Sequence, residues 1–381
     1  MLSELQNLYE RNLFESVIPF WLRHSIDREH GGFFTCLDRT GAIYDTRKYV
    51  WLNGRQVWTF AKLYNTIERR PEWLDAARSG AEFLRGHVFD EQGRCYFSLT
   101  REGQPSFYQR KPYGAGFVAL GFWEFARASG EDWYRSKALE LYARIAEWIA
   151  NPSLLGRSPL AGGTAMSNLA DIYILASLAL EIGDSAMLAK CLQDIRLHVD
   201  PGTGLLHETA TLDPGLRKSS PDARLICPGS IFEIYWILGR ALRLCPDAEA
   251  EALLLRALDA ACELAWDTQF GGYYYFMDID GRPMLQLESD MKLWWVHCEG
   301  IYALLCAHLQ TNDSKWKTRL RQAHDWTWSR FPDAASGEWF GYLHRDGSLS
   351  HSLKGNNYKG CFHVPRMLLY SVLDLRRANQ H

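Results

Sequence analysis

A motif that recurs along the chain constrains its fold more than any other feature. Each copy has glycine, then aromatic or aliphatic residues, then a polar turn that ends in glycine. Copies lie at 27–41, 90–103, 267–281 and 333–347, with a weaker one at 200–215. The motif is typical of a short β-hairpin, because glycine supplies the turn and alternating aromatics supply the strands. The copies lie roughly 60–70 residues apart, or about twice that across one gap, which predicts a repeat architecture.

The segments between the motifs are helical in pattern. Apolar residues recur at three- and four-residue spacings in 55–68, 114–129, 133–150, 168–183, 248–266 and 293–309. Two helices and one hairpin per unit of about 63 residues, six times over, predict an all-α (α/α)6 barrel with short β-hairpins in its loops. The sixth unit falls near 154–166, where the hairpin motif is missing. An irregular helical fold is the alternative; no linker is evident, so we expect residues 1–381 to form a single catalytic domain.

The composition limits the class of partner. The chain has 381 residues and a net charge of −3, so there is no electrostatic reason to expect binding to nucleic acid or to an anionic membrane. No apolar run has the length of a transmembrane helix, and the N-terminus lacks the basic and apolar regions of a signal peptide. The nine cysteines are scattered without a C-x-x-C pair. This pattern indicates reduced thiols in a cytoplasmic protein.

Aromatic residues are abundant, at 13% of the chain with 15 tryptophans. Many of these rings can be large core fillers. They also suit sugar binding, because the apolar face of a pyranose stacks on a flat ring. For any single tryptophan we expect packing rather than sugar contact.

Four stretches have more polar and aromatic residues at helical spacing than a dry core tolerates. In the first, 49–64, Arg55 lies among tryptophans; a buried arginine needs a partner, either a core glutamate or sugar oxygens. The second, 225–240, starts with a Pro-Gly pair that is typical of a helix N-terminus. Ser230 and Glu233 follow with the spacing of a capping box, which gives this pair a structural explanation.

The other two stretches each contain a histidine. MKLWWVHCEGIYALL places Trp295 and Glu299 on one helical face and His297 on a neighbouring face. A carboxylate beside tryptophan on an inner helix is costly unless it is used or paired. NNYKGCFHVPRMLLY sets His363 between a lysine and Arg366. A lone histidine is most often structural, but these neighbours favour a polar pocket.

The motifs RQVW, PGxxxE, MKLWWxHxE and above all KGCFHVPR resemble those of the N-acylglucosamine 2-epimerase family, in the same order, over about residues 50–366. The resemblance implies an (α/α)6 barrel. Members of this family interconvert sugars at C2, for example N-acetylglucosamine with N-acetylmannosamine, or glucose with mannose. Others isomerise aldoses to ketoses. The resemblance therefore implies an isomerase acting on a small sugar, and it raises the expectation of a homodimer. We expect no cofactor and no metal, because the histidines are dispersed and arginine and histidine can stabilise the reaction intermediate without one.

The reaction explains the residue types. The sugar must open so that C1 is a carbonyl and the C2 proton is acidic; a base then removes that proton to give an enediolate. Histidine suits this step, and a cationic arginine stabilises the oxyanion. The resemblance implies His363 as catalytic base or acid, Arg55 as oxyanion ligand, and Glu299 and Glu233 as further catalytic carboxylates. Other implied sugar-binding residues are Trp58, Tyr113, His207, Glu208, Ser230, Lys292, Trp295, His297, Lys359 and Arg366.

The sequence departs from the family at one position. The family usually has P-G-H-x-x-E, and its histidine acts on the opposite face of C2; here that residue is Ser230. Serine is no base near pH 7 without help. The protein is then an epimerase in which His297, His207 or a water held by Ser230 covers the second face. Alternatively it is an aldose–ketose isomerase that uses His363 alone, or a sugar-binding relative with little turnover.

An alternative from another reaction class is a glycoside hydrolase, since barrels of this kind host many. Hydrolysis would need two opposed carboxylates. Glu233 and Glu299 form the pair that we would nominate.

Overall fold

The computed structural model describes residues 2–158, 161–216 and 219–379. These residues form two compact units, each built from segments far apart in the sequence. The first unit takes in 2–158, 333–339 and 352–379; the second takes in 161–216, 219–332 and 340–351.

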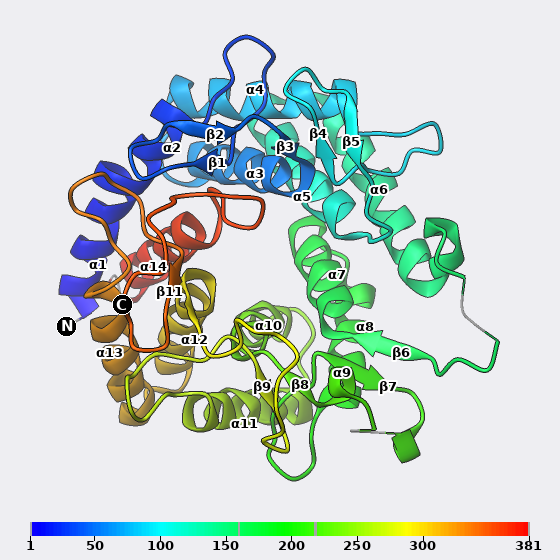
Figure 1. Cartoon of the computed structure of the whole chain (residues 1–381), viewed down its shortest axis with the longest axis vertical. Helices are drawn as coiled ribbons and strands as arrows, with labels where there is room; N and C mark the ends of the chain where they lie inside the picture. Colours follow the sequence, from blue (N-terminus) through cyan, green and yellow to red (C-terminus); the bar gives the residue numbers. More distant parts are fainter. Residues whose placement is uncertain (1, 159–160, 217–218, 380–381) are drawn as a thin grey trace. The chain divides into compact units, whose positions relative to one another are not determined.

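The first unit is mostly helical (Figure 1). Its helices are α1 (Leu2–Arg11), the π-helix η1 (Asn12–Val17), α2 (Ile18–His24), α3 (Val50–Thr66), α4 (Pro71–His87), α5 (Tyr113–Ser129), α6 (Asp132–Ala150), the 3₁₀ helix η2 (Pro152–Leu155) and α14 (His363–Ala378). Its strands are β1 (Cys36–Leu37), β2 (Ile43–Asp45), β3 (Lys48–Tyr49), β4 (Ser98–Leu99) and β5 (Pro105–Phe107). Within this unit α3 packs against α4, α5 and α14, while α5 also packs against α6 and α1 packs against α14.

The second unit repeats this pattern. Its helices are α7 (Leu169–Ile182), α8 (Ser185–Asp194), η3 (Ile195–His198), η4 (Pro214–Leu216), α9 (Pro221–Arg224), α10 (Pro228–Ala241), α11 (Ala248–Leu264), α12 (Trp294–Thr311) and α13 (Ser314–Trp328). Its strands are β6 (Met166–Asn168), β7 (Thr209–Thr211), β8 (Leu225–Ile226), β9 (Met277–Asp278), β10 (Lys292–Leu293) and β11 (Tyr342–Leu343). Here α10 packs against α7, α11 and α12, and α12 packs against α13.

The six helical segments predicted from periodicity correspond to α3, α5, α6, α7, α11 and α12. Glycines explain how two of them pack so closely. A Cβ on Gly54 in α3 would lie 2.5 Å from the carbonyl oxygen of Phe117 in α5, and a Cβ on Gly121 would lie 2.6 Å from that of Gly54. Glycine inside a helix costs about 1 kcal/mol relative to alanine. The close crossing of α3 and α5 requires it at both positions.

The glycine turns predicted from the repeats are confirmed in all five copies. In each turn an aspartate carbonyl accepts a hydrogen bond from the amide of a glycine with φ between +70° and +80°. The aspartate–glycine pairs are Asp27–Gly31, Asp90–Gly93, Asp200–Gly204, Asp267–Gly271 and Asp333–Gly337. Glycine adopts this left-handed backbone without the penalty that a Cβ imposes.

The hairpin prediction was right only in part. β1 pairs with β2 and β4 with β5, as hairpins do. The later copies are closed only by single antiparallel bridges, Val199 with Leu206, Trp266 with Tyr273 and Leu343 with Leu349. Their strands pair with the short strand that leads into an earlier helix: β7 with β6, β9 with β8, and β11 with β10. These pairings hold the starts of α7, α10 and α12. The stretch 154–166 includes the end of η2, and its residues 159–160 lie outside the described part of the chain.

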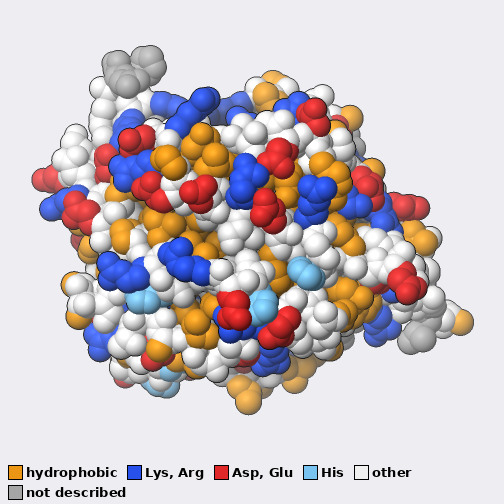
Figure 2. Space-filling view, turned by 90° about the horizontal axis from the view of Figure 1, so that it is seen from above, with side chains coloured by type: hydrophobic (Ala, Val, Ile, Leu, Met, Phe, Trp, Pro, Cys, Tyr) orange, Lys and Arg blue, Asp and Glu red, His pale blue; other side chains and the backbone are white. Residues whose placement is uncertain are grey.

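Charges of both signs are mixed on the surface. On the face shown in Figure 2, lysine and arginine side chains lie among aspartates and glutamates, without an extended region of one sign. None of the helices in the described ranges combines the length and apolar character needed to span a bilayer. All nine cysteines are free thiols.

Candidate active site

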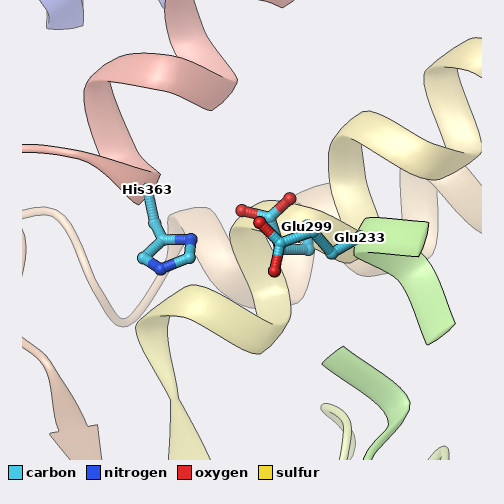
Figure 3. A group of neighbouring side chains, drawn as sticks. All are labelled: Glu233, Glu299 and His363. Carbon is cyan, nitrogen blue, oxygen red and sulfur yellow. The ribbon is translucent and has the colours of Figure 1, made fainter. Parts of the chain in front are cut away.

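His363 is the first residue of α14 and is buried in the first unit, with 6% of its surface exposed; its imidazole is labelled in Figure 3. The guanidinium of Arg366, one turn later, lies 3.4 Å from His363 Nδ1. Arginine only donates hydrogen bonds, so Nδ1 is the acceptor in this contact. The guanidinium also lies 4.3 Å from the centre of the Phe362 ring. The sequence therefore predicted correctly that this histidine has a cationic neighbour.

Arg55 lies in α3 and is surrounded by aromatic rings. Its guanidinium carbon is 3.9 Å from the centre of the Phe117 ring, 4.5 Å from that of Trp51 and 4.7 Å from that of Phe362. Only 4% of the residue is exposed. Cation–π contact stabilises a desolvated guanidinium. The positive charge is thus held by ring faces, an arrangement that neither sequence interpretation of Arg55 included.

The other two sugar-binding candidates on α3 and α5 have different surroundings. Trp58 is buried, and its ring meets those of Phe362 and Tyr370 edge-on, at 5.4 and 5.9 Å. It is a packing residue in this structure. Tyr113 is the first residue of α5 and is partly exposed.

Glu233 of α10 and Glu299 of α12 form a buried acidic pair in the second unit. A carboxylate oxygen of one lies within 4.8 Å of a carboxylate oxygen of the other, and Figure 3 shows the two groups side by side. Trp236 donates a hydrogen bond from its indole Nε1 to Glu299 Oε2 at 2.8 Å. Sequence analysis missed Trp236, although its position one turn after Glu233 was a usable signal. The pair supplies few oxygen ligands for a hard divalent cation, which takes about six or more, so we do not assign these glutamates as metal ligands.

Glu208 and Ser230 lie beside this pair. The Ser230 hydroxyl hydrogen-bonds to the Glu208 carboxyl group. The pKa of Glu208 is raised to about 7, mainly by burial; the bond from Ser230 opposes the rise and the negative charge of Glu233 adds to it. The capping box predicted for Ser230 and Glu233 was wrong: the N-cap of α10 is Cys227, which makes no side-chain capping bond. The Ser230 hydroxyl bonds to the Glu208 carboxyl group and does not cap the helix.

Trp295 covers the start of α10. A Cβ on Gly229 would lie 2.5 Å from the Trp295 ring, so this contact requires glycine. The Trp295 ring also meets the Tyr275 ring edge-on at 6.0 Å. Trp295 is partly exposed.

Two predicted sugar-binding lysines form ion pairs within the fold. Lys292 is fully buried, and its ammonium lies 3.1 Å from Asp267, the aspartate of a glycine turn. Burial lowers the pKa of Lys292 to about 8, and Asp267 opposes the shift. Lys359 is likewise buried, 2.8 Å from Glu338. We do not carry either lysine forward as a sugar ligand.

The two other histidines among the sugar-binding candidates also contact groups within the fold. His297 Nδ1 contacts the Leu293 carbonyl at 2.7 Å, while Nε2 accepts a hydrogen bond from the Tyr273 amide at 3.0 Å. Burial lowers the pKa of His297 to about 3. His207 Nε2 lies 3.5 Å from Asp200, again the aspartate of a glycine turn. With both ring nitrogens bonded, His297 is unsuited to carry a proton to or from a substrate.

Comparison with known proteins agrees with the motifs. The family model for N-acylglucosamine 2-epimerase (GlcNAc 2-epimerase) matches residues 32–158 and 206–364. The N-acylglucosamine 2-epimerase of Bos taurus is 40% identical over 369 residues, which cover 93% of this chain and 87% of that protein.

Solved structures confirm the predicted (α/α)6 fold class. The structure of cellobiose 2-epimerase from Spirochaeta thermophila superposes with a TM-score of 0.83 at 19% identity and covers 99% of this chain and 98% of its own. A crystal structure of D-mannose isomerase gives a TM-score of 0.82 at 19% identity, with 97% of both chains covered. Because an epimerase and an isomerase share this fold, the fold does not choose the reaction. The family model and the bovine relative together show that the chain belongs to the N-acylglucosamine 2-epimerase family.

Proposed function

We propose that the protein is a sugar 2-epimerase that interconverts N-acyl-D-glucosamine and N-acyl-D-mannosamine. The observation that carries this proposal is the 40% identity to the bovine N-acylglucosamine 2-epimerase across 93% of the chain. The proposal places the enzyme among the isomerases. It takes the whole chain as one catalytic domain, since the family model matches segments of both units.

His363 is the proposed base at C2. Its Nδ1 faces the Arg366 guanidinium, which only donates. In the neutral ring the proton then sits on Nε2, and the hydrogen bond fixes the orientation of the imidazole. Histidine is the side chain that most readily takes and returns a proton near neutral pH. Arg55 is the proposed ligand of the enediolate oxygen, since a preorganised cation stabilises charge as it develops.

The acidic pair has the proposed role of holding the sugar. Carboxylates accept hydrogen bonds from hydroxyl groups, and charge-assisted bonds are shorter and stronger than neutral ones. Trp236 fixes Glu299 through its indole bond, which orients the carboxylate. Trp295 and Tyr113 are proposed to line the sugar site, since both keep exposed surface.

A second candidate is aldose–ketose isomerisation. The observation that favours it is Ser230 at the position of the second family histidine, together with the bonded state of His297. One base carries the proton from C2 to C1 in that reaction, so no second group is needed. To a lesser degree, the same observation favours a sugar-binding relative with little turnover. The hydrolase alternative is not carried forward, because family membership favours chemistry at C2.

The deciding experiment is incubation with N-acetylmannosamine in deuterated water, followed by NMR. We expect exchange of the C2 proton together with formation of N-acetylglucosamine. Formation of a ketose from mannose or another aldose would instead establish the isomerase, and no exchange with any aldose would reject both. A His363→Asn variant should lose epimerisation at least about 100-fold, the lower range for general acid–base catalysis.

We further propose that the enzyme is cytoplasmic and homodimeric. Nine free cysteines support a reducing compartment. Light scattering on the purified protein tests the dimer, and a monomeric mass at micromolar concentration would reject it.

A further inference from the structure

Glu208 is held in place by its backbone. Its amide donates to the Leu225 carbonyl at 3.0 Å, and its carbonyl accepts from the Leu169 amide at 2.8 Å. Leu169 is the first residue of α7, and Leu225 belongs to β8, which leads into α10. The side chain is therefore carried by a segment fixed on two sides, as a group that transfers protons requires.

The Glu208 carboxyl group is incompletely bonded. Oε1 is buried and has no hydrogen-bond partner among the described residues. The other nearby polar groups are the Ser230 hydroxyl, which bonds to the carboxyl, and the Glu233 carboxylate, whose charge acts on it. A buried polar atom without a hydrogen-bond partner is destabilising. An atom of this kind beside an acidic pair indicates that a ligand completes its bonding.

Two further titratable groups that interact with Glu208 stay neutral at physiological pH. Burial raises the pKa of the Cys227 thiol and that of the Tyr275 phenol well above neutrality, and Glu208 adds to both shifts. The shifts that matter for Glu208 itself come from burial, Glu233 and Ser230, which bring its pKa to about 7. At that value both protonation states are populated at neutral pH, which suits a general acid and base.

Epimerisation needs a second proton-transfer group. The family histidine is replaced by Ser230, and His297 has both ring nitrogens bonded within the fold. Serine is a poor base on its own. Among the residues of the second unit described above, Glu208 alone combines a buried open oxygen with a direct bond to Ser230.

We propose that Glu208 transfers the second proton at C2, and that Ser230 orients it. This inference rests on the proposed epimerase function. In one direction His363 takes the C2 proton and becomes imidazolium, the C2–H bond breaks, and an enediolate forms. The protonated Glu208 carboxyl then gives its proton to the other face of C2 and becomes carboxylate. In the reverse direction Glu208 is the base and His363 the acid; no oxidant or reductant is consumed.

The test compares the two epimers in deuterated water with the Glu208→Gln variant. Interconversion should fall at least about 100-fold. Exchange of the C2 proton should persist, without inversion, for the epimer that His363 deprotonates, and it should be lost for the other. His363→Asn should give the mirror-image pattern. Glu208→Gln with Ser230→His should recover interconversion, because the family histidine is restored.

Two outcomes overturn the proposal. Interconversion by Glu208→Gln at the wild-type rate shows that the carboxyl moves no proton. An equal loss of exchange for both epimers, in a variant with a wild-type melting temperature, shows a sugar ligand only. Inactivity of the wild-type protein toward both epimers rejects the proposed function instead, so the two failures are distinguishable.

Ser230→Ala keeps the proposal testable if Glu208→Gln does not fold. Loss of the hydroxyl removes a bond that lowers the pKa of Glu208. The inflection that Glu208 contributes to the kcat/KM profile should therefore move to higher pH. An unchanged pH profile overturns the proposal, because a purely structural serine alters stability and leaves the inflection in place.

Discussion

Replacement of Lys292 by methionine separates the structural role of this residue from the sugar-binding role that its motif suggested. The Lys292 ammonium lies 3.1 Å from Asp267 Oδ2, and the two side chains are 0% and 1% exposed. Lys292→Met keeps the length of the side chain and removes the charge. The Asp267 carboxylate would remain buried, with the Arg345 guanidinium at 2.8 Å as its remaining cation.

The expected magnitude follows from this geometry. Removal of one partner of a buried ion pair costs about 3–5 kcal/mol. Because Arg345 remains and its side chain is 41% exposed, we expect the lower end, about 3 kcal/mol. Urea unfolding followed by circular dichroism measures the free energy of unfolding. Below the transition, KM for the sugar should be unchanged.

The matched control is Lys315→Met. Lys315 pairs with Asp259 at the same distance of 3.1 Å, but its side chain is 42% exposed, and exposed pairs contribute little. We expect its unfolding curve to overlay that of the wild-type protein. A Lys292→Met variant with wild-type stability and a KM raised tenfold or more would refute the structural assignment and restore Lys292 as a sugar ligand.

Three further predictions concern the second unit and one turn of the first. Trp236→Phe removes the indole donor to Glu299; kcat/KM should fall about 10-fold or more, and the free energy of unfolding should fall by about 1.5–3 kcal/mol, the contribution of a hydrogen bond to a charged group. Gly229→Ala sets a Cβ 2.5 Å from the Trp295 ring; overpacking should lower the free energy of unfolding by about 1–3 kcal/mol in urea titrations, and an unchanged midpoint would contradict the contact. Hydrogen bonds from an arginine and a lysine lower the pKa of Asp333 despite its burial. Its contribution to stability is therefore present above the unfolded pKa of about 4 and lost as pH falls below it. Melting temperatures between pH 5 and pH 2.5 should fall less steeply for Asp333→Asn than for the wild-type protein.

The sequence by itself determined the repeat and the residue types of the site. Glycine turns and helical periodicity are local properties, because φ preference and the 3.6-residue repeat depend on near neighbours. They located the glycine turns and the main helices. The motif around His363 likewise identified the family and the cationic neighbour Arg366, since both residues lie within one helical turn.

Strand pairing could not be predicted from the sequence, because the paired strands are distant in the chain. The hairpin motif specifies a turn. A strand of two or three residues forms too few backbone hydrogen bonds to select its partner strand. The fold selects that partner. β9 therefore pairs with β8, some 50 residues earlier in the chain, and that pairing positions the start of α10.

Only the tertiary structure decided which polar residues are available for chemistry. Lys292 and His297 belong to the same motif as Glu299, yet burial and partners from the 267–273 turn give both a structural role. Glu208 showed the opposite: the sequence implied only a sugar contact, and burial beside Ser230 and Glu233 brings its pKa close to neutrality. Desolvation and charge interactions depend on what surrounds a group in three dimensions, so they are decided by the fold and not by sequence spacing.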